Sequence, residues 1–343
     1  MHNGSFWYPS PFLPFPDLIL SPVVPEHFSS PVFLYERDGR FQALGLDIEV
    51  VICEAGTGDM LKRLRQGTLD LAFCVTEGLT TAIANETAAD LDTRAESPVR
   101  MVGTYVESPL CWAVSTGYNA RPTEIADLQG GTMGISRYGS GSHIMSLYMA
   151  DKYGWSQGGD GKGNASGLQF QVLHNLPGLT EGAVTGQIDA FLWELFTTKN
   201  LYDQKVLKHI GNVIPPWSSF TIAARVHRVL DSTEGRATVQ RFLAVLNQAV
   251  ADFLTGMRSP TVESSEETAD SLPRSLAFLM ERFRYSEKDA QDWFKTVRYP
   301  ADVRQVAREE IRNCIAILTG AGAIHTEAKD PSEIISKDVA QLV

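Results

Sequence analysis

The chain has 343 residues, of which 43% are hydrophobic and 21% are charged, an ordinary globular composition with enough apolar residues for a sizeable core in two domains. Its formal net charge of −11 argues against nucleic acid as the main partner, because phosphate backbones are bound by basic surfaces. No apolar run approaches the ~20 residues of a membrane-spanning helix, so we expect no membrane insertion. The sequence leaves open whether the chain forms a homo-oligomer.

The first sixteen residues are rich in proline and aromatic side chains. The prolines prevent a helical apolar segment, and the stretch has neither a basic start nor a small-residue cleavage motif. We therefore interpret residues 1–16 as a disordered or loosely docked extension and expect a cytoplasmic protein. The four cysteines form no Cys-x-x-Cys pair, which favours reduced core thiols, and we expect no metal and no cofactor.

Strand-like and helix-like segments alternate over the next ninety residues. The predicted strands are 18–24, 46–55, 69–75 and 99–106, and the predicted helices are 31–45, 58–67 and 77–91. This alternation is typical of a parallel sheet with helices on its faces. A first α/β unit therefore begins near residue 17.

A second alternating unit follows at residues 108–215. Its predicted strands are 108–116, 131–136, 168–174 and 188–195, its predicted helices are 121–130, 139–154 and 175–187, and a Gly/Ser-rich loop spans 155–167. The extended segments in "HIGNVIPPWSSFTIAARV" indicate a return to the first unit. The remainder is predicted to be helical at 227–257, 263–284, 286–296 and 302–320.

These elements predict an α/β protein with two lobes. Lobe I comprises residues 17–107 and 216–343, including the C-terminal helices, and lobe II comprises residues 108–215. Each lobe is expected to be a mostly parallel sheet flanked by helices.

Small, hydroxylated, aromatic or acidic residues follow six of the predicted strands, in "PEHFSS", "AGTGDM", "VTEGL", "SRYGSGSH", "WELFTT" and "PPWSSF". Each stretch alone is equally explained as a tight turn or a helix cap. In open parallel sheets, however, ligands bind beyond the carboxyl ends of the strands. Together the stretches predict a cleft between the lobes, lined by backbone N–H groups at helix N-termini, which suits an anionic group. The candidate ligand-binding residues are Glu26, His27, Phe28, Ser29, Gly56, Thr57, Gly58, Thr76, Glu77, Ser136, Tyr138, Gly139, Ser140, Trp193, Glu194 and Trp217.

The first of these loops contains the candidate with the most varied chemistry. His27 can donate a hydrogen bond to an oxyanion or titrate near neutral pH, although a locally bonded structural histidine explains it equally well. Phe28 offers a stacking surface. Ser29 or Ser30 is expected to cap the next helix, with Pro31 in its first turn.

Three carboxylates, Glu26, Glu77 and Glu194, are expected in the cleft. Beside anion-binding turns they favour a ligand with both an acidic part and a hydrogen-bond-donating part, unless they only brace loops. Trp193 and Trp217 either stack on a ring or pack between the lobes.

As an ordered set, "PEHFSSPVFL", "GTGDMLKRLRQGTLDLAFCVTEG", "GISRYGSGSHIMS", "DAFLWELFTTK" and "PPWSSF" resemble the type II periplasmic-binding-protein-like family. The resemblance is to the branch for nitrate, sulfonates and bicarbonate, and within it to an uncharacterised fungal, intracellular subgroup. It implies two lobes joined by crossings near 105–109 and 215–220 that close on a small molecule.

Two departures matter. Bacterial relatives are exported and feed a membrane transporter, whereas we find no export signal in this sequence, which argues against a transport role. The second departure is from the fungal thiamine pyrimidine synthase of the same superfamily. The segment "CVTEGLTTA" has neither the lysine that would hold pyridoxal phosphate nor the histidine, and "IPPWSSFTIAARV" has no cysteine. That chemistry is therefore not carried over.

The sequence thus favours a soluble intracellular binding protein for a small anionic or zwitterionic organic molecule. The alternative is an enzyme of thiamine-pyrimidine-like or other heteroaromatic metabolism, with His27 and Glu77 or Glu194 as acid and base. A third interpretation is a binding fold used for partner contacts through the acidic stretch at 259–275, for which a solvated face is a simpler explanation.

Overall fold

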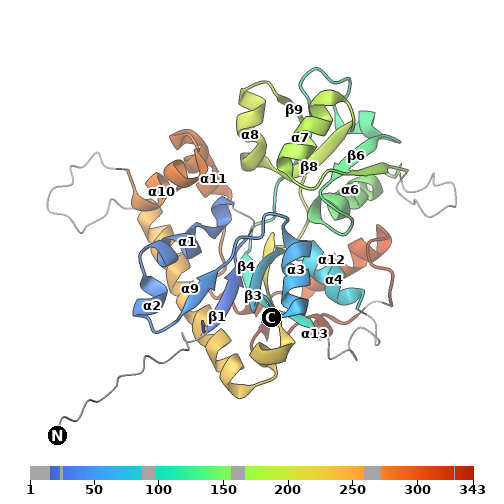
Figure 1. Cartoon of the computed structure of the whole chain (residues 1–343). Coiled ribbons are helices and arrows are strands. Elements are labelled where there is room, and N and C mark those ends of the chain that lie inside the picture. The colour runs from blue at the N-terminus through green and yellow to red at the C-terminus, as the bar shows by residue number, and fades with distance from the viewer. Residues whose placement is uncertain (1–15, 24–25, 87–97, 156–166, 259–271, 328) are drawn as a thin grey trace, which may run out of the picture.

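The computed structural model describes residues 16–23, 26–86, 98–155, 167–258, 272–327 and 329–343. Almost all of the expected N-terminal extension, of the loop at 155–167 and of the acidic stretch at 259–275 lies outside these ranges. Within them, two five-stranded sheets flanked by helices form two lobes, as the sequence predicts (Figure 1).

The sheet of lobe I has the order β2-β1-β3-β10-β4. Its strands are β1 (Leu18–Ser21), β2 (Ile48–Val50), β3 (Leu71–Val75), β4 (Val99–Val106) and β10 (Phe220–Arg225). The first three strands are parallel, whereas β10 runs antiparallel to both β3 and β4. This departs from a simple parallel sheet because β10 returns from lobe II and enters at the edge where β3 and β4 end.

Helices cover both faces of this sheet. They are α1 (Ser30–Arg37), α2 (Arg40–Ala43), α3 (Thr57–Gln66), α4 (Thr76–Ala84), α9 (Thr233–Arg258), α10 (Arg274–Phe283), α11 (Glu287–Thr296), α12 (Arg308–Gly320) and α13 (Pro331–Ile334). The single helix expected at 31–45 is broken, because Gly39 has a φ of 63° between α1 and α2. Helix α9 begins later than expected, after Arg228 adopts a φ of 77°.

The sheet of lobe II has the order β7-β6-β8-β5-β9. Its strands are β5 (Trp112–Gly117), β6 (Thr132–Ile135), β7 (Gln169–Val172), β8 (Ala190–Glu194) and β9 (Leu207–Val213), and its helices are α6 (Gly141–Lys152), α7 (Leu176–Thr185) and α8 (Leu195–Asp203). Helix α8 was missed by the sequence analysis. Strand β5 is antiparallel to β8 and β9.

Short elements complete the chain: the turns η1 (His27–Ser29), η2 (Ile125–Leu128) and η4 (Val226–Leu230), and a parallel pair of β11 (Gln305–Val306) with β12 (Gln341–Leu342). Segments 107–111 and 214–219 link the two sheets. Both segments leave the same edge of the lobe I sheet, so the loops after its strands face lobe II.

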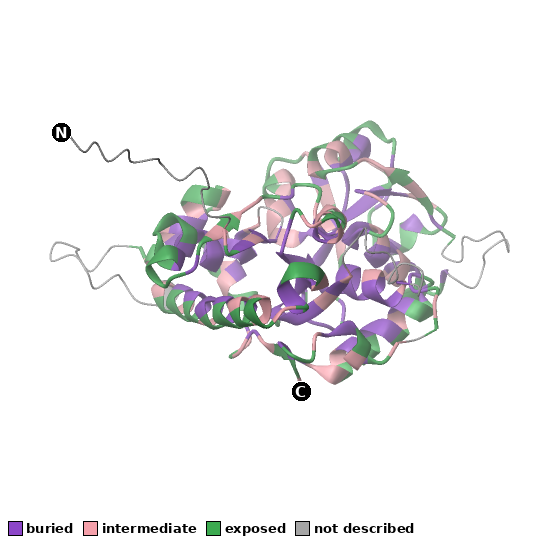
Figure 2. Ribbon diagram, turned by 60° about the horizontal axis from the view of Figure 1, so that its bottom comes forward, coloured by how far each residue is buried: buried purple, intermediate pink, exposed green. Residues whose placement is uncertain are grey.

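One large apolar cluster spans both lobes, and a smaller one lies under α7. Figure 2 shows the buried residues concentrated in the sheets and on the inner faces of the helices. Helix α9 turns an apolar face to the core, with Val239, Phe242, Leu243 and Leu246 fully buried. Across the described ranges, no helix is both long and apolar enough to cross a bilayer.

Candidate functional site

A pocket lies between the lobes, at the carboxyl ends of strands from both sheets. Gly56, Thr57 and Val75 line it from lobe I, and Ser136 and Ser140 line it from lobe II. The cavity offers about 70 Å³ of space to water-sized molecules. This is below the roughly 300–1,000 Å³ of pockets for drug-sized ligands, so only a compact group fits in this conformation.

Two helices from opposite lobes start at this pocket. Gly56, with a φ of 75°, is the N-cap of α3, and the Thr57 hydroxyl accepts the Val75 N–H at 3.1 Å, which holds the start of α3 against the end of β3. Ser140 is the N-cap of α6, followed by Gly141 and Ser142 in the pocket wall. Both N-termini present backbone N–H groups and a positive dipole end, which favour an anion.

Arg137 is the cation of the pocket, and the sequence analysis overlooked it. It follows β6 in lobe II, and its guanidinium donates to the carbonyl oxygen of Ala55 in lobe I. Gly58 makes room for it: a Cβ on Gly58 would lie 2.2 Å from Arg137 Nε. Burial lowers the pKa of Arg137, but guanidinium stays charged in proteins. We call Gly56, Arg137 and Ser140 with the two helix starts the donor end.

Two carboxyl groups line another part of the pocket. Glu194 is the N-cap of α8, and its Oε2 accepts the Thr197 N–H at 2.7 Å and the Thr197 hydroxyl at 2.9 Å. It is 3% exposed, and this burial raises its pKa to about 7. Burial and the Glu194 charge raise the pKa of Glu26 well above its ordinary value, against a hydrogen bond from Trp193.

His27 lies behind these carboxyl groups, fully buried, and does not line the pocket. Its Nδ1 is 2.6 Å from the Tyr285 hydroxyl oxygen, and its Nε2 is 3.8 Å from Glu194 Oε1. Its ring packs edge-on against Trp293, with 4.7 Å between centroids. Burial lowers its pKa to about 3, so the imidazole is neutral at physiological pH. We call Glu26, His27 and Glu194 the acceptor end.

Comparisons with known proteins agree with the two-lobed fold. Residues 112–213 match the family model described as "Ca3427-like PBP". The structure of the Candida albicans CA3427 gene product matches at 27% identity and a TM-score of 0.77, covering 96% of this chain and 99% of that one. That protein is described as defining a new family of proteins with the generic periplasmic binding protein fold.

The chain has a type II periplasmic-binding-protein-like fold.

Two sulfonate-binding proteins share the fold. The alkanesulfonate-binding protein SsuA from Xanthomonas axonopodis pv. citri, bound to MOPS, matches at 14% identity and a TM-score of 0.67, over 92% of this chain and 96% of its own. The aliphatic sulphonate binding protein SsuA from Escherichia coli matches at 15% identity and a TM-score of 0.62, over 95% of this chain and 93% of its own. These two matches show the shared fold. The comparison with curated proteins gave no significant match.

In this periplasmic-binding-protein-like fold, seven of the predicted site residues line the pocket: Glu26, Gly56, Thr57, Ser136, Ser140, Trp193 and Glu194. Their contact with a ligand stays a prediction. The pocket wall also includes side chains that the sequence analysis missed: Val23, Glu54, Phe73, Leu110, Trp112, Arg137, Ser142 and Phe220. Arg137 lies inside the quoted stretch "SRYGSGSH", and a search for a cation beside the anion-binding turns would have found it.

Phe28 and the two serines after it are structural. The Phe28 ring packs against Phe220 at 5.0 Å, and its carbonyl oxygen accepts the hydroxyls of Tyr105 and Tyr299 at 2.7 and 2.8 Å. The expected side-chain cap is wrong, because the Ser29 hydroxyl donates to Val23 and the Ser30 hydroxyl to His27. These side-chain bonds to the carbonyl oxygens of Val23 and His27 hold the turn before α1, and Pro31 lies in the first turn of the helix as predicted.

Glu77 and Trp217 lie away from the pocket. Trp217 Nε1 donates to Glu77 Oε2 at 3.0 Å, and both side chains are almost fully buried at the base of segment 214–219. Burial raises the pKa of Glu77 to about 7. The neighbouring Thr76 is also buried, with its N–H donating to the Ser219 carbonyl. Trp217 in segment 214–219 therefore covers Glu77.

Three more candidates lie outside the pocket wall. Tyr138 is 64% exposed and makes an edge-on contact with His143. The Gly139 N–H donates to His143 Nδ1 at 3.1 Å, and Gly58 faces Arg137 rather than the cavity. None of the three lies in the pocket wall.

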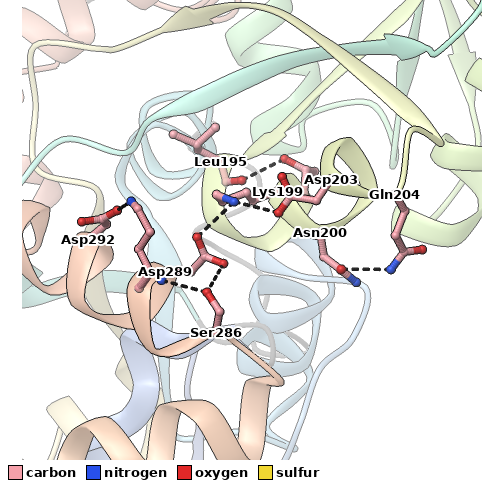
Figure 3. Close-up of polar contacts among 10 residues, drawn as sticks. Leu195, Lys199, Asn200, Asp203, Gln204, Ser286, Asp289 and Asp292 are labelled. Atoms are coloured by element: carbon pink, nitrogen blue, oxygen red, sulfur yellow. Dashed lines mark hydrogen bonds and ion pairs between the residues drawn. The ribbon is translucent and has the colours of Figure 1, made fainter.

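An ion pair joins the lobes beside the acceptor end. Figure 3 shows Lys199 of α8 reaching Asp289 of α11, which is 3.1 Å away, while Asp289 also receives the Ser286 hydroxyl. Lys199 also pairs with Asp203 within α8 at 2.7 Å. Among the residues that the structure describes, no group of three or more His, Cys, Asp or Glu could hold a metal ion.

Proposed function

We propose that the chain is a binding protein for a small organic molecule with an anionic group, held in the pocket between its lobes. The convergence of Arg137 with the N-termini of α3 and α6 supports this proposal. One guanidinium and two helix starts, contributed by both lobes, supply several N–H donors, although Glu54 also lines the pocket and the charge of Asp59 acts on Arg137. A sulfonate, carboxylate or phosphate group matches that set of donors.

The proposal is tested by isothermal titration with alkyl sulfonates, carboxylates and phosphates, using the wild-type chain and Arg137→Gln. Loss of a charge-assisted bond should weaken anion binding about 10- to 100-fold. Arg121→Gln is the matched control, because Arg121 is an exposed arginine of lobe II outside the pocket wall. Equal affinities of Arg137→Gln and the wild type, or no binding of any anion, would contradict the proposal.

The enzymatic alternative receives less support. His27 is fully buried behind the pocket with a pKa lowered to about 3 by burial, so it is a weak base, and Glu77 lies outside the pocket wall. The intracellular location stays a prediction, and fractionation of the native host followed by immunoblotting measures it.

A further inference from the structure

Hydrogen bonds hold the groups at and behind the acceptor end. The Thr197 hydroxyl donates to Glu194 Oε2 at 2.9 Å. The Tyr285 hydroxyl lies 2.6 Å from Nδ1 of the neutral His27, and the tautomer of the imidazole decides which of the two atoms donates.

His27 Nε2 is fully buried and has no hydrogen-bond partner among the described residues. Glu194 Oε1 lies 3.8 Å from it, which is beyond hydrogen-bond distance, so His27 does not satisfy this carboxyl oxygen. An unsatisfied polar group at a buried site is costly, which leaves Glu194 able to take a donor from the pocket.

The charges of this end are unbalanced as well. Glu26 and Glu194 repel each other in the same pocket wall, and within the described part of the chain neither has a Lys or Arg at ion-pair distance. A hydrogen bond from Trp193 lowers the pKa of Glu26, but by less than burial and the Glu194 charge raise it. Two carboxyl groups in one pocket wall form a site for a group with N–H donors and a positive charge.

We infer that the ligand is a zwitterion whose ammonium group lies at Glu26 and Glu194, while its anionic group lies at the donor end. This inference rests on the proposed function, because the anion must occupy the donor end for the ammonium group to reach the carboxyl pair. Glu26 and Glu194 are then specificity-determining residues, and they select for a compound with a positive charge.

Matched pairs of ligands test the inference. Each pair differs by one ammonium group: 2-aminoethanesulfonate and ethanesulfonate, 3-aminopropanoate and propanoate, 2-aminoethyl phosphate and ethyl phosphate. Titration calorimetry of the wild-type chain at pH 8, where Glu194 is largely ionised, should show a preference of about tenfold or more for the amino member of the pair that fits.

Variants assign that preference to the carboxyl pair. Glu194→Gln and Glu26→Gln should each reduce it to less than about threefold and leave the affinity for the ligand without the amino group unchanged or higher, because repulsion is removed. Both substitutions keep the shape of the side chain, and the glutamine oxygen at position 194 still accepts from Thr197. Glu181→Gln on α7, an exposed carboxyl outside the pocket, is the control and should keep the wild-type preference.

The outcomes separate the two proposals. If ligands without an amino group bind as tightly as their amino partners, the carboxyl pair shares a proton instead and the inference is overturned, while the anion proposal stands. If the preference persists in both glutamine variants, the ammonium group lies elsewhere and the inference fails. If no compound of any pair binds, both proposals fall together.

Discussion

The donor end and the acceptor end of the pocket are built from the same local structure, a helix that begins directly after a strand or its turn, yet they have opposite polarity. At α3 the N-cap is Gly56, which has no side chain to occupy the free N–H groups of the helix. At α8 the N-cap is Glu194, whose carboxyl group accepts from Thr197. The N-cap residue thus decides whether a helix start attracts an anion or presents one.

The largest expected effect concerns pH, because the acceptor end titrates near neutrality. The folded-state pKa of Glu194 is raised from 4.5 to about 7, so its protonated form is favoured by folding. Its contribution to stability is complete below pH 4.5 and is lost as pH rises through about 7. Glu194→Gln, which stays neutral, should therefore be more stable than the wild type at pH 8 by about 3 kcal/mol and unchanged at pH 4.

Urea unfolding of both proteins at pH 4 and pH 8 measures this difference. Glu77→Gln sharpens the comparison, because burial raises the pKa of Glu77 to about 7 as well. Glu77→Gln should show the same gain in the free energy of unfolding at pH 8. It should not change the preference for amino ligands, since Glu77 lies outside the pocket. If the wild type and Glu194→Gln differ by the same free energy of unfolding at pH 4 and pH 8, the expectation is contradicted.

A smaller effect is expected at the donor end from Gly58→Ala. The new Cβ would lie 2.2 Å from Arg137 Nε, so the guanidinium must move, and anion affinity should fall about tenfold in titration calorimetry. Stability should not fall, because alanine favours the helix over glycine. Gly320→Ala on α12 is the control: nothing lies within 4 Å of its added Cβ, so affinity should not change. Unchanged affinity in Gly58→Ala would show that the position of Arg137 does not matter.

The smallest effect is expected from Lys199→Ala, which removes the ion pair between the lobes. Lys199 is 36% exposed, so the pair should be worth about 1 kcal/mol or less, and closure and ligand affinity should weaken no more than about fivefold. Lys288→Ala removes a pair within α11 instead and should leave affinity unchanged. Small-angle scattering of both variants measures the fraction of open molecules, and equal fractions would exclude a role for Lys199.

Most of the fold was predictable from the sequence, because strands and helices alternate with a clear periodicity. The exception in the lobe I sheet is β10, whose antiparallel direction depends on where the chain returns rather than on local residues. Helix α8 was missed because "LFTTKNLYD" has no strong apolar period, and its start depends on the Glu194 cap.

The site was predictable only in part. Strand-end position correctly indicated the loops near the pocket, but it could not separate Glu194 from Glu77, which both follow a strand. The difference comes from segment 214–219, which brings Trp217 onto Glu77 from 140 residues away. His27 was expected in the cleft, whereas Trp293 and Tyr285, far along the chain, enclose it.

The position of β10 has a consequence for synthesis on the ribosome. The sheet of lobe II is formed by contiguous strands from Trp112 to Val213, whereas β3 and β4 have a vacant place between them until Phe220–Arg225 emerges. The later lobe can therefore assemble first, and the earlier one waits with two exposed strand edges. Translation speed just beyond residue 213 thus governs how long the nascent chain is vulnerable to aggregation.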